Sequence, residues 1–503
     1  MAVTTGIQPS DDKASLKGQH VETIDNEKRT GSDLGDEEIS EEDNIRLRRR
    51  IDWFIMPLLC LVYGLQYLDK TGLSYASIMG IIPDTKMTLA NYSWLGTIFY
   101  FGFLAGEYPL TYALQRWPIA KVTGITIIVW GIVLGCMAAC HDFKGLLVVR
   151  FFLGFFESSI TPALTIFTAQ WYRIREQSFR TGMWYSTQAG ISIFGGLVAY
   201  GFAKAGAEHK LSIHSWRAIL LLFAAMTVAT GVLFFFLIPD SVETAWFLNE
   251  RDRKLARLRT KENQLGVVDR TWKWYQVREA LLDPAVWLLC LVSLCLVSLC
   301  LMIPSGGLLN FYGIVVSQMG FSSQMTLLLS LAGSWNIFNV LFFPWLAGKY
   351  GYRALISIMP CGIALAGTAM VWGCKDKYAR FVGYNLGLGY AATFALSLSL
   401  LTSNVAGRTK KTFVNGMFLV AFCAGNLIGP QTFREKDKPK YVPALTSIVV
   451  LYAFSMFLMV CVHFLYTSRN KKRAALWAEG SEPVADDSED LTDRENPYFH
   501  YAF

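Results

Sequence analysis

The chain has 503 residues, of which 53% are hydrophobic, 14% aromatic and 17% charged. This composition excludes a soluble globular protein of this size, because such proteins carry about a quarter of their residues as charged side chains. The formal net charge of +7 does not indicate a nucleic-acid partner, since the Lys and Arg residues stand in short clusters between apolar runs rather than along one basic face.

Residues 1–48 are predicted to be a disordered tail, because they are polar and acidic and contain no apolar run. The basic cluster Arg46-Leu-Arg-Arg-Arg50 lies directly before the first apolar run, which favours a cytoplasmic N-terminus.

Twelve apolar runs long enough to cross a bilayer follow, in two groups of six. The runs lie at 53–80, 92–114, 119–139, 146–171, 180–203 and 216–238, and then at 285–316, 325–346, 354–374, 379–404, 413–430 and 442–466. The fold class is therefore an all-α membrane protein with twelve transmembrane helices in two six-helix bundles. The bundles span 49–240 and 285–468, joined by a charged linker, 241–284, with an amphipathic helix at the membrane surface, and followed by a cytoplasmic tail, 469–503.

Charge and repetition both support this organisation. Lys and Arg are more frequent in the loops on the side of the linker than in the other loops, which predicts that both termini are cytoplasmic.

A faint repeat pairs Thr181-Gly-Met-Trp184 with Asn415-Gly-Met-Phe418 at an offset of 234 residues, and the same offset pairs Gly195 with Gly429. Parallel repeats of this kind are typical of transporters whose two bundles rock about a site at the membrane midplane.

The fourth run contains two opposite charges, in Arg150-Phe-Phe-Leu-Gly-Phe-Phe-Glu157. A charge near the bilayer centre costs about 3 kcal/mol even on insertion scales, so both side chains are expected to face the protein interior or a watery cavity. Seven positions are about two helical turns, which places both residues on nearly the same side. We interpret Glu157 as a proton-titrating group with Arg150 as its neighbour; the alternative is a permanent structural tie within one helix.

A second charged pair, Asp69-Lys70, lies inside the first run. Adjacent helical residues differ by about 100°, so the two side chains cannot point the same way. One hypothesis is that Lys70 binds an anionic substrate while Asp69 orients it and takes part in proton coupling. The other is that the span ends at Tyr67 and both residues are solvated.

Neutral polar residues in the second group are candidate substrate contacts. Asn310 and Tyr312 follow Pro304-Ser-Gly-Gly307, a pattern typical of a helix broken beside a cavity. Asparagine between helices is at least as often a packing contact as a binding group. The further candidates are Asn336, Asn385 and Asn415.

No catalytic pattern is present in the sequence. It contains no Walker sequence, no phosphate-binding glycine loop and no His, Cys and acid cluster with metal spacing. The ten cysteines lie almost wholly inside apolar runs, where buried free thiols are expected. The sequence therefore predicts no enzyme, no cofactor and no metal, and a gradient rather than ATP as the driving force.

A specific pattern runs from Ser403-Asn-Val-Ala-Gly407 to Gly425-Asn-Leu-Ile-Gly-Pro-Gln-Thr-Phe433, and Leu68-Asp-Lys-Thr-Gly-Leu-Ser-Tyr-Ala76 and Pro239-Asp-Ser-Val-Glu-Thr244 accompany it. Over residues 50–470 these motifs resemble the fungal allantoate permease family of anion:cation symporters, within the major facilitator superfamily. The resemblance implies proton-coupled uptake of a small organic anion such as allantoate, ureidosuccinate, nicotinate, pantothenate or biotin.

A more distant resemblance concerns the charged residues. The stretch from Arg150 to Ala163 is similar to the fourth span of the animal organic-anion transporters for sialic acid and glutamate, in which the acid that matches Glu157 is linked to proton coupling. Lys70 matches a substrate-binding arginine of that group. Lysine keeps the charge but lacks the bidentate fork that suits a carboxylate.

We therefore expect a secondary active transporter that takes up a small organic anion with protons by alternating access, as a monomer in the plasma membrane. The partners are the anion and the lipid bilayer, with the proton as coupling ion. The alternative is a proton-antiport exporter of a metabolite or drug, because the same fold serves both directions. Aligning Arg150-Phe with Arg380-Phe places Gly387 opposite Glu157, which predicts that the acid belongs to one bundle only.

Overall fold

The structure is a computed structural model that describes residues 40–261, 273–282, 292–478, 492–493, 495–496 and 499–502. Most of the predicted N-terminal tail and the first residues of the seventh predicted span lie outside these ranges. Every regular element among the described residues is helical, and Ile51–Phe503 forms one compact unit.

The first bundle contains seven main helices and one short helix. They are α2 (Glu41–Ile78), α3 (Ile81–Asp84), α4 (Leu89–Arg116), α5 (Ile119–Ala139), α6 (Phe143–Glu157), α7 (Ile160–Trp171), α8 (Ile174–Ala207) and α9 (Ser215–Leu237). The helices α6 and α7 together form one span, 143–171, with a short break between them.

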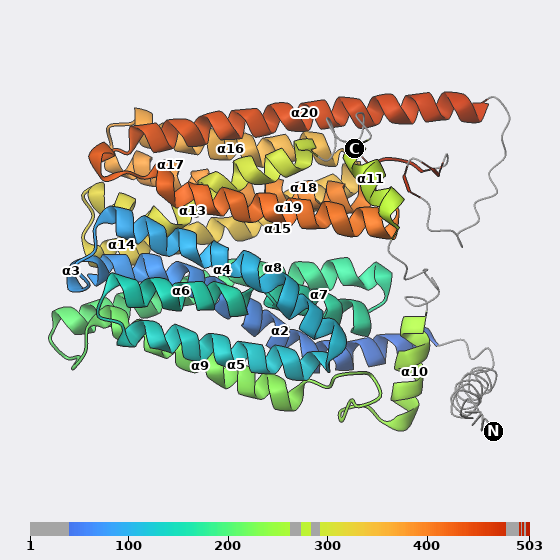
Figure 1. Ribbon diagram of the computed structural model, residues 1–503, viewed down its shortest axis with the longest axis horizontal. Helices are drawn as coiled ribbons and strands as arrows, with labels where there is room; N and C mark the ends of the chain where they lie inside the picture. The colour runs from blue at the N-terminus through green and yellow to red at the C-terminus, as the bar shows by residue number, and fades with distance from the viewer. Residues whose placement is uncertain are drawn as a thin grey trace, which may run out of the picture. The chain divides into compact units, whose positions relative to one another are not determined.

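The second bundle repeats this pattern. It consists of α13 (Val292–Gln318), α14 (Ser323–Leu329), η3 (Ser330–Trp335), α15 (Asn336–Tyr350), α16 (Arg353–Gly373), α17 (Lys377–Gly387), α18 (Tyr390–Asn404), α19 (Arg408–Ile428), η4 (Gly429–Thr432), η5 (Glu435–Asp437) and α20 (Val442–Ala478). In Figure 1 the helices of the first bundle lie on one side and those of the second bundle on the other.

Among the described residues, eleven helical segments are long and apolar enough to cross a membrane. The remaining predicted span is α4, whose 28 residues are also long enough, at about 42 Å. Its Tyr, Trp, Ser and Gly residues make it less apolar than the others. The structure thus confirms the expected all-α membrane fold.

The helix boundaries show the internal repeat more clearly than the sequence does. Leu89–Arg116 corresponds to Ser323–Tyr350 at an offset of 234 residues, and Ile119–Ala139 corresponds to Arg353–Gly373 at the same offset. The fourth span breaks after Glu157 and the tenth breaks after Gly387. The alignment of Glu157 with Gly387 therefore agrees with the positions of the two breaks.

Glycines bring α4 and α6 into close contact. A Cβ atom built on Gly154 would lie 1.9 Å from the carbonyl oxygen of Phe99, and one on Gly102 would lie 1.9 Å from that of Phe151. Only small residues permit backbones to approach this closely in a membrane. Because Gly154 lies between Arg150 and Glu157, this contact fixes the position of both charged residues.

The linker between the bundles contains two helices, α10 (Glu250–Lys261) and α11 (Trp274–Leu282). On α10, Arg259 forms an ion pair with Glu176 of the first bundle. On α11, Gln276 Oε1 accepts hydrogen bonds from the backbone N–H groups of Thr409 (3.1 Å) and Lys410 (3.3 Å), at the start of α19. We call the end of the bundles that carries α10 and α11 the linker end.

Hydrogen bonds join the two bundles toward the opposite end. The hydroxyl of Tyr92 donates to the carbonyl of Asn310 at 2.8 Å, and the N–H of Gly313 donates to Ser74 Oγ at 3.1 Å. The hydroxyl of Thr97 donates to the carbonyl of Leu427 at 3.0 Å. The helices α2 and α4 are thereby tied to α13 and α19.

Candidate functional site

Asp69 and Lys70 lie inside a continuous helix. The helix α2 runs to Ile78, and Asp69 is only 1% exposed. The alternative that the span ends at Tyr67 with both residues solvated is therefore wrong. As expected for neighbours on a helix, the side chains diverge: Asp69 Oδ2 accepts a hydrogen bond from Trp130 Nε1 of α5 at 2.6 Å, while Lys70 extends toward α6.

Arg150 and Glu157 are both buried on α6, with exposed fractions of 3% and 0%. Lys70 Nζ lies 3.0 Å from Glu157 Oε1, so the acid forms an ion pair with another helix. The guanidinium carbon of Arg150 lies 6.0 Å from the ring centroid of Phe99. The permanent tie between Arg150 and Glu157 within one helix is not formed.

These four side chains form a cluster of balanced charge, with two cations and two carboxylates, in which Asp69, Arg150 and Glu157 are buried and Lys70 is partly exposed. Its hydrogen bonding is incomplete: Asp69 Oδ1, Arg150 Nε and Glu157 Oε2 are buried without a hydrogen-bond partner among the described residues. Each such group costs about 1–3 kcal/mol. Unsatisfied buried groups of this kind are expected at a functional site that exchanges a ligand or a proton. They are not expected at a contact whose role is only structural.

A cavity of ≈ 10 Å³ lies beside the cluster, which is about the space of one water molecule. It is lined by Lys70, Gly96, Phe99, Tyr100, Arg150, Leu309 and Asn310, and so by both bundles. A second cavity of ≈ 60 Å³ is lined by Tyr67 and Tyr185 of the first bundle and Asn336 of the second, among others. Both are far smaller than the roughly 300 Å³ at which ligand pockets begin.

The polar residues predicted in the second bundle do not all meet at these cavities. Asn310 lines the first cavity, and its Nδ2 donates to the carbonyl of Gly306 at 2.7 Å. Asn336 lines the second cavity. Tyr312 donates to the carbonyl of Leu329 at 3.0 Å, Asn385 is buried against its own helix, and Asn415 is exposed near the start of α19. These last three residues line neither cavity.

The break expected after Pro304 is not formed. The helix α13 runs from Val292 to Gln318 with Pro304 inside it. Gly306 and Gly307 instead allow α19 and η4 to approach closely, because a Cβ atom on Gly306 would lie 2.9 Å from the carbonyl oxygen of Asn426. Neighbouring helices commonly compensate for a proline inside a transmembrane helix.

Sequence reasoning missed Trp130 and Tyr92. Trp130 is fully buried and donates to Asp69, and Tyr92 joins the bundles beside the cavity. Both have an aromatic ring with one polar atom, which usually finds a partner when buried. That rule predicts from the sequence that both are hydrogen-bond donors. It does not predict their partners, because each partner lies on another helix.

The comparisons with known proteins agree with this architecture. Residues 59–430 match the Major Facilitator Superfamily. An uncharacterized transporter of Schizosaccharomyces pombe is 36% identical over 93% of this chain and 92% of its own length. Allantoate permease of Saccharomyces cerevisiae is 32% identical over 95% of this chain and 90% of its own length.

Among solved structures, a bacterial homologue of the human lysosomal transporter Spinster, in an inward-facing and occupied conformation, has a TM-score of 0.58. The match covers 82% of this chain and 96% of the Spinster homologue at 14% identity, and it therefore supports the fold alone. The chain therefore belongs to the Major Facilitator Superfamily, among the fungal transporters related to allantoate permease, and is a membrane transporter of small solutes rather than an enzyme.

Proposed function

We propose that this protein takes up a small organic anion together with a proton, and that the anion and Glu157 compete for Lys70. The observation that carries the proposal is the 3.0 Å ion pair between Lys70 Nζ and Glu157 Oε1, in which Lys70 also lines a cavity between the two bundles. Lys70 is the residue that would hold the anion, with Arg150 and Asn310 on the same cavity wall. The sequence resemblance and the relation to allantoate permease favour a carboxylate nutrient.

The charges of the cluster explain why a proton would accompany the anion. With Lys70 and Arg150 positive and Asp69 and Glu157 negative, the cluster is neutral when empty. An added anion would leave an uncompensated charge in a medium of low dielectric constant, which is costly. Protonation of Glu157 releases Lys70 and gives the cluster one positive charge, which one carboxylate then neutralises. Deprotonation restores the ion pair and expels the anion.

Release and loading require the bundles to move. The hydrogen bonds between Tyr92 and Asn310 and between Ser74 and Gly313 tie the two bundles together toward the opposite end in this structure. The cavities of ≈ 10 and ≈ 60 Å³ are too small for a carboxylate nutrient. Alternating access would therefore break these bonds to admit the anion from the opposite side and re-form them before release at the linker end.

We further propose that the linker end is cytoplasmic. The basic loops at Arg173 and Lys410 lie at this end of the helices, and in the sequence a basic cluster directly precedes the first span. Positively charged loops remain in the cytoplasm. On this orientation, the proton gradient across a fungal plasma membrane would drive uptake.

The test is uptake of radiolabelled carboxylates by proteoliposomes under imposed proton gradients. We expect wild-type uptake to rise with an inward proton gradient and Glu157→Gln to lose that dependence while still exchanging anion for anion. Glu107→Gln is the matched control, because Glu107 is another acid inside a span, whereas the ion pair of Lys70 is with Glu157. If Glu157→Gln keeps the wild-type gradient dependence, Glu157 is not the coupling residue. If an inward proton gradient drives labelled anion out, the protein is an antiporter.

A further inference from the structure

The last residues of the chain dock onto the second bundle at the linker end. Tyr501 is 2% exposed and stacks on Tyr466 of α20, with ring centroids 5.3 Å apart. Its backbone N–H donates to Asn470 Oδ1 at 3.0 Å, and Asn470 Nδ2 donates back to its carbonyl at 2.8 Å. Ala502 and Asn404 of α18 form the same reciprocal pair at 2.7 Å. Four hydrogen bonds thus hold two consecutive residues of the tail.

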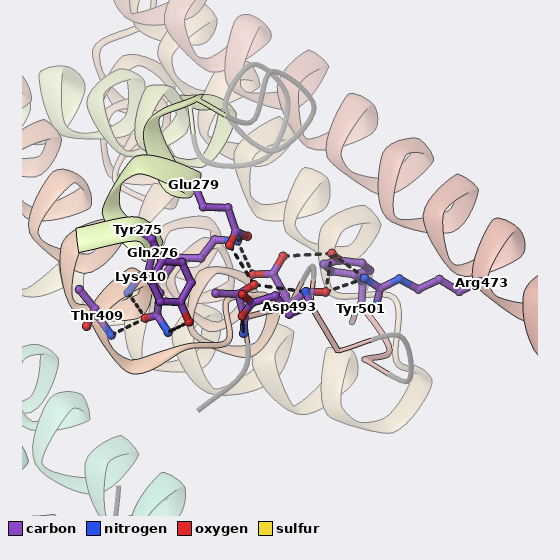
Figure 2. Close-up of polar contacts among 10 residues, drawn as sticks. Tyr275, Gln276, Glu279, Thr409, Lys410, Arg473, Asp493 and Tyr501 are labelled. Atoms are coloured by element: carbon purple, nitrogen blue, oxygen red, sulfur yellow. Dashed lines mark hydrogen bonds and ion pairs between the residues drawn. The ribbon is translucent and has the colours of Figure 1, made fainter. Parts of the chain in front are cut away.

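The docked segment also places a second carboxylate on a buried lysine. Lys410 of α19 is 0% exposed, and its Nζ lies 2.6 Å from Asp493 Oδ1 and 2.9 Å from Glu279 Oε1 of α11. Figure 2 shows this chain of polar contacts from Gln276 and Glu279 through Lys410 and Asp493 to Tyr501 and Arg473. The tail, the linker helix α11 and the spans α19 and α20 are therefore joined at one place.

Thr492 lies at the centre of this contact and is 0% exposed. Its hydroxyl donates to Glu279 Oε2 at 3.0 Å and accepts from the N–H of Glu495 at 3.2 Å, while its own N–H donates to Glu495 Oε2 at 2.9 Å. Thr492 and Glu495 form the reciprocal pair of a capping box. Two carboxylates thus accept hydrogen bonds from Thr492, that of Glu279 from the hydroxyl and that of Glu495 from the backbone N–H.

This environment excludes a phosphate group. A phosphate on Thr492 Oγ would carry between one and two negative charges and would need space that the closed contact does not provide. It would face the carboxylate of Glu279, and the cation that contacts Glu279, Lys410, is already shared between the carboxylates of Glu279 and Asp493. The free tail, by contrast, presents Thr492 in the acidic sequence Asp490-Leu-Thr-Asp-Arg-Glu495, which suits kinases that select acidic sites.

We propose that the docked tail residues Thr492, Asp493, Tyr501 and Ala502 form a releasable latch on the second bundle, and that Thr492 is a phosphorylation site whose phosphate keeps the latch undocked. In the modification, Thr492 Oγ takes the γ-phosphoryl group of ATP, its proton leaves, and ADP is released. The kinase acts on the undocked population, and the product cannot dock again. Release removes Asp493 from Lys410 and Thr492 from Glu279, so that α11 loses its contact with the tail and is held on α19 by Gln276 and by the Glu279–Lys410 pair.

The test is hydrogen–deuterium exchange of the full chain in nanodiscs, read at the amides of Tyr501 and Ala502. Both amides are hydrogen-bonded only while the latch is docked on Asn470 and Asn404. We expect protected amides in the wild type and exchange roughly tenfold faster or more in Thr492→Glu. Phosphorylation of the wild type by an acidophilic protein kinase with ATP should modify Thr492 and have the same effect.

Two further variants separate this proposal from loss of structure. Ser488→Glu adds the same charge to the same tail, at a position outside the described residues, and should keep both amides protected. Adding Glu279→Gln to Thr492→Glu should restore part of the protection, because the facing carboxylate is gone and Asp493 still pairs with Lys410. Wild-type protection in Thr492→Glu, or equal loss in Ser488→Glu, would overturn the proposal. Unchanged exchange within α20 shows that each variant is folded.

Discussion

Replacing Gly154 by alanine tests whether the contact between α4 and α6 positions the charged cluster. The added Cβ atom would lie 1.9 Å from the carbonyl oxygen of Phe99, whereas real Cβ atoms stay at least 3.0 Å away. The neighbour is backbone, so no side chain can turn aside. The two helices must therefore separate by about 1 Å or more, which is the difference between these distances.

The expected magnitude has two parts. Overpacking of this kind costs about 1–3 kcal/mol, against a gain of about 1 kcal/mol for alanine over glycine in a helix. The larger effect concerns the site, because α6 carries both Arg150 and Glu157. A displacement of 1 Å is a third of the 3.0 Å between Lys70 Nζ and Glu157 Oε1. Misplacement of reacting groups by this amount can reduce a rate by about 100-fold.

The assay combines thermal unfolding of the purified protein with initial rates of anion uptake. Gly201→Ala is the matched control, because Gly201 lies on α8 of the same bundle with nothing within 4 Å of its Cβ position among the described residues. We expect Gly154→Ala to lower the midpoint of unfolding by about 2–6 °C and to abolish most uptake. The control should unfold at or above the wild-type midpoint. Wild-type uptake by Gly154→Ala would refute the argument that this contact sets the geometry of the cluster.

Two further predictions concern the cavity and its closure. Lys70→Gln should weaken anion binding by at least about 30-fold, measured as KM for uptake, because it removes the cation in the cavity wall that would pair with the anion, whereas Lys70→Arg should keep a measurable part of the affinity. Equal loss in both would show that shape rather than charge matters at this position. Tyr92→Phe removes one hydrogen bond between the bundles, worth about 1 kcal/mol, and should shift the conformational equilibrium about fivefold. The measurement is the labelling rate of Phe99→Cys in an otherwise cysteine-free chain. With Tyr92→Phe, this cysteine should react faster with an impermeant thiol reagent that is added on the side of the membrane away from the linker end.

The sequence predicts the spans and the buried face of α6 because both depend on local periodicity. Arg150 and Glu157 are two turns apart, so their common side follows from helix geometry alone. Whether α2 would continue through Asp69 and Lys70 does not follow from local pattern, since the answer depends on Trp130 and Glu157, which compensate these charges from other helices. For the same reason the break after Pro304 was a wrong prediction.

The docking of the tail was beyond prediction for a related reason. An acidic, polar stretch after the last span resembles any solvated tail, and its composition contains no apolar run that would indicate packing. Three of its partners, Glu279, Asn404 and Lys410, lie 83 or more residues away in the chain. The informative signal is the capping pair Thr492 and Glu495, which indicates a local turn but not the surface that the turn contacts.

The internal repeat explains why the charged cluster belongs to one bundle. Helix boundaries align Leu89–Arg116 with Ser323–Tyr350 at an offset of 234, and the breaks of the fourth and tenth spans align Glu157 with Gly387. At an offset of 234 throughout, the residue opposite Glu157 would be Ala391, which is also uncharged. The second bundle therefore offers neutral groups to both cavities, Asn310 to one and Asn336 to the other. On the proposed mechanism, the first bundle would carry the exchange of proton for anion, and the second bundle would decide by shape and hydrogen bonding which anion fits.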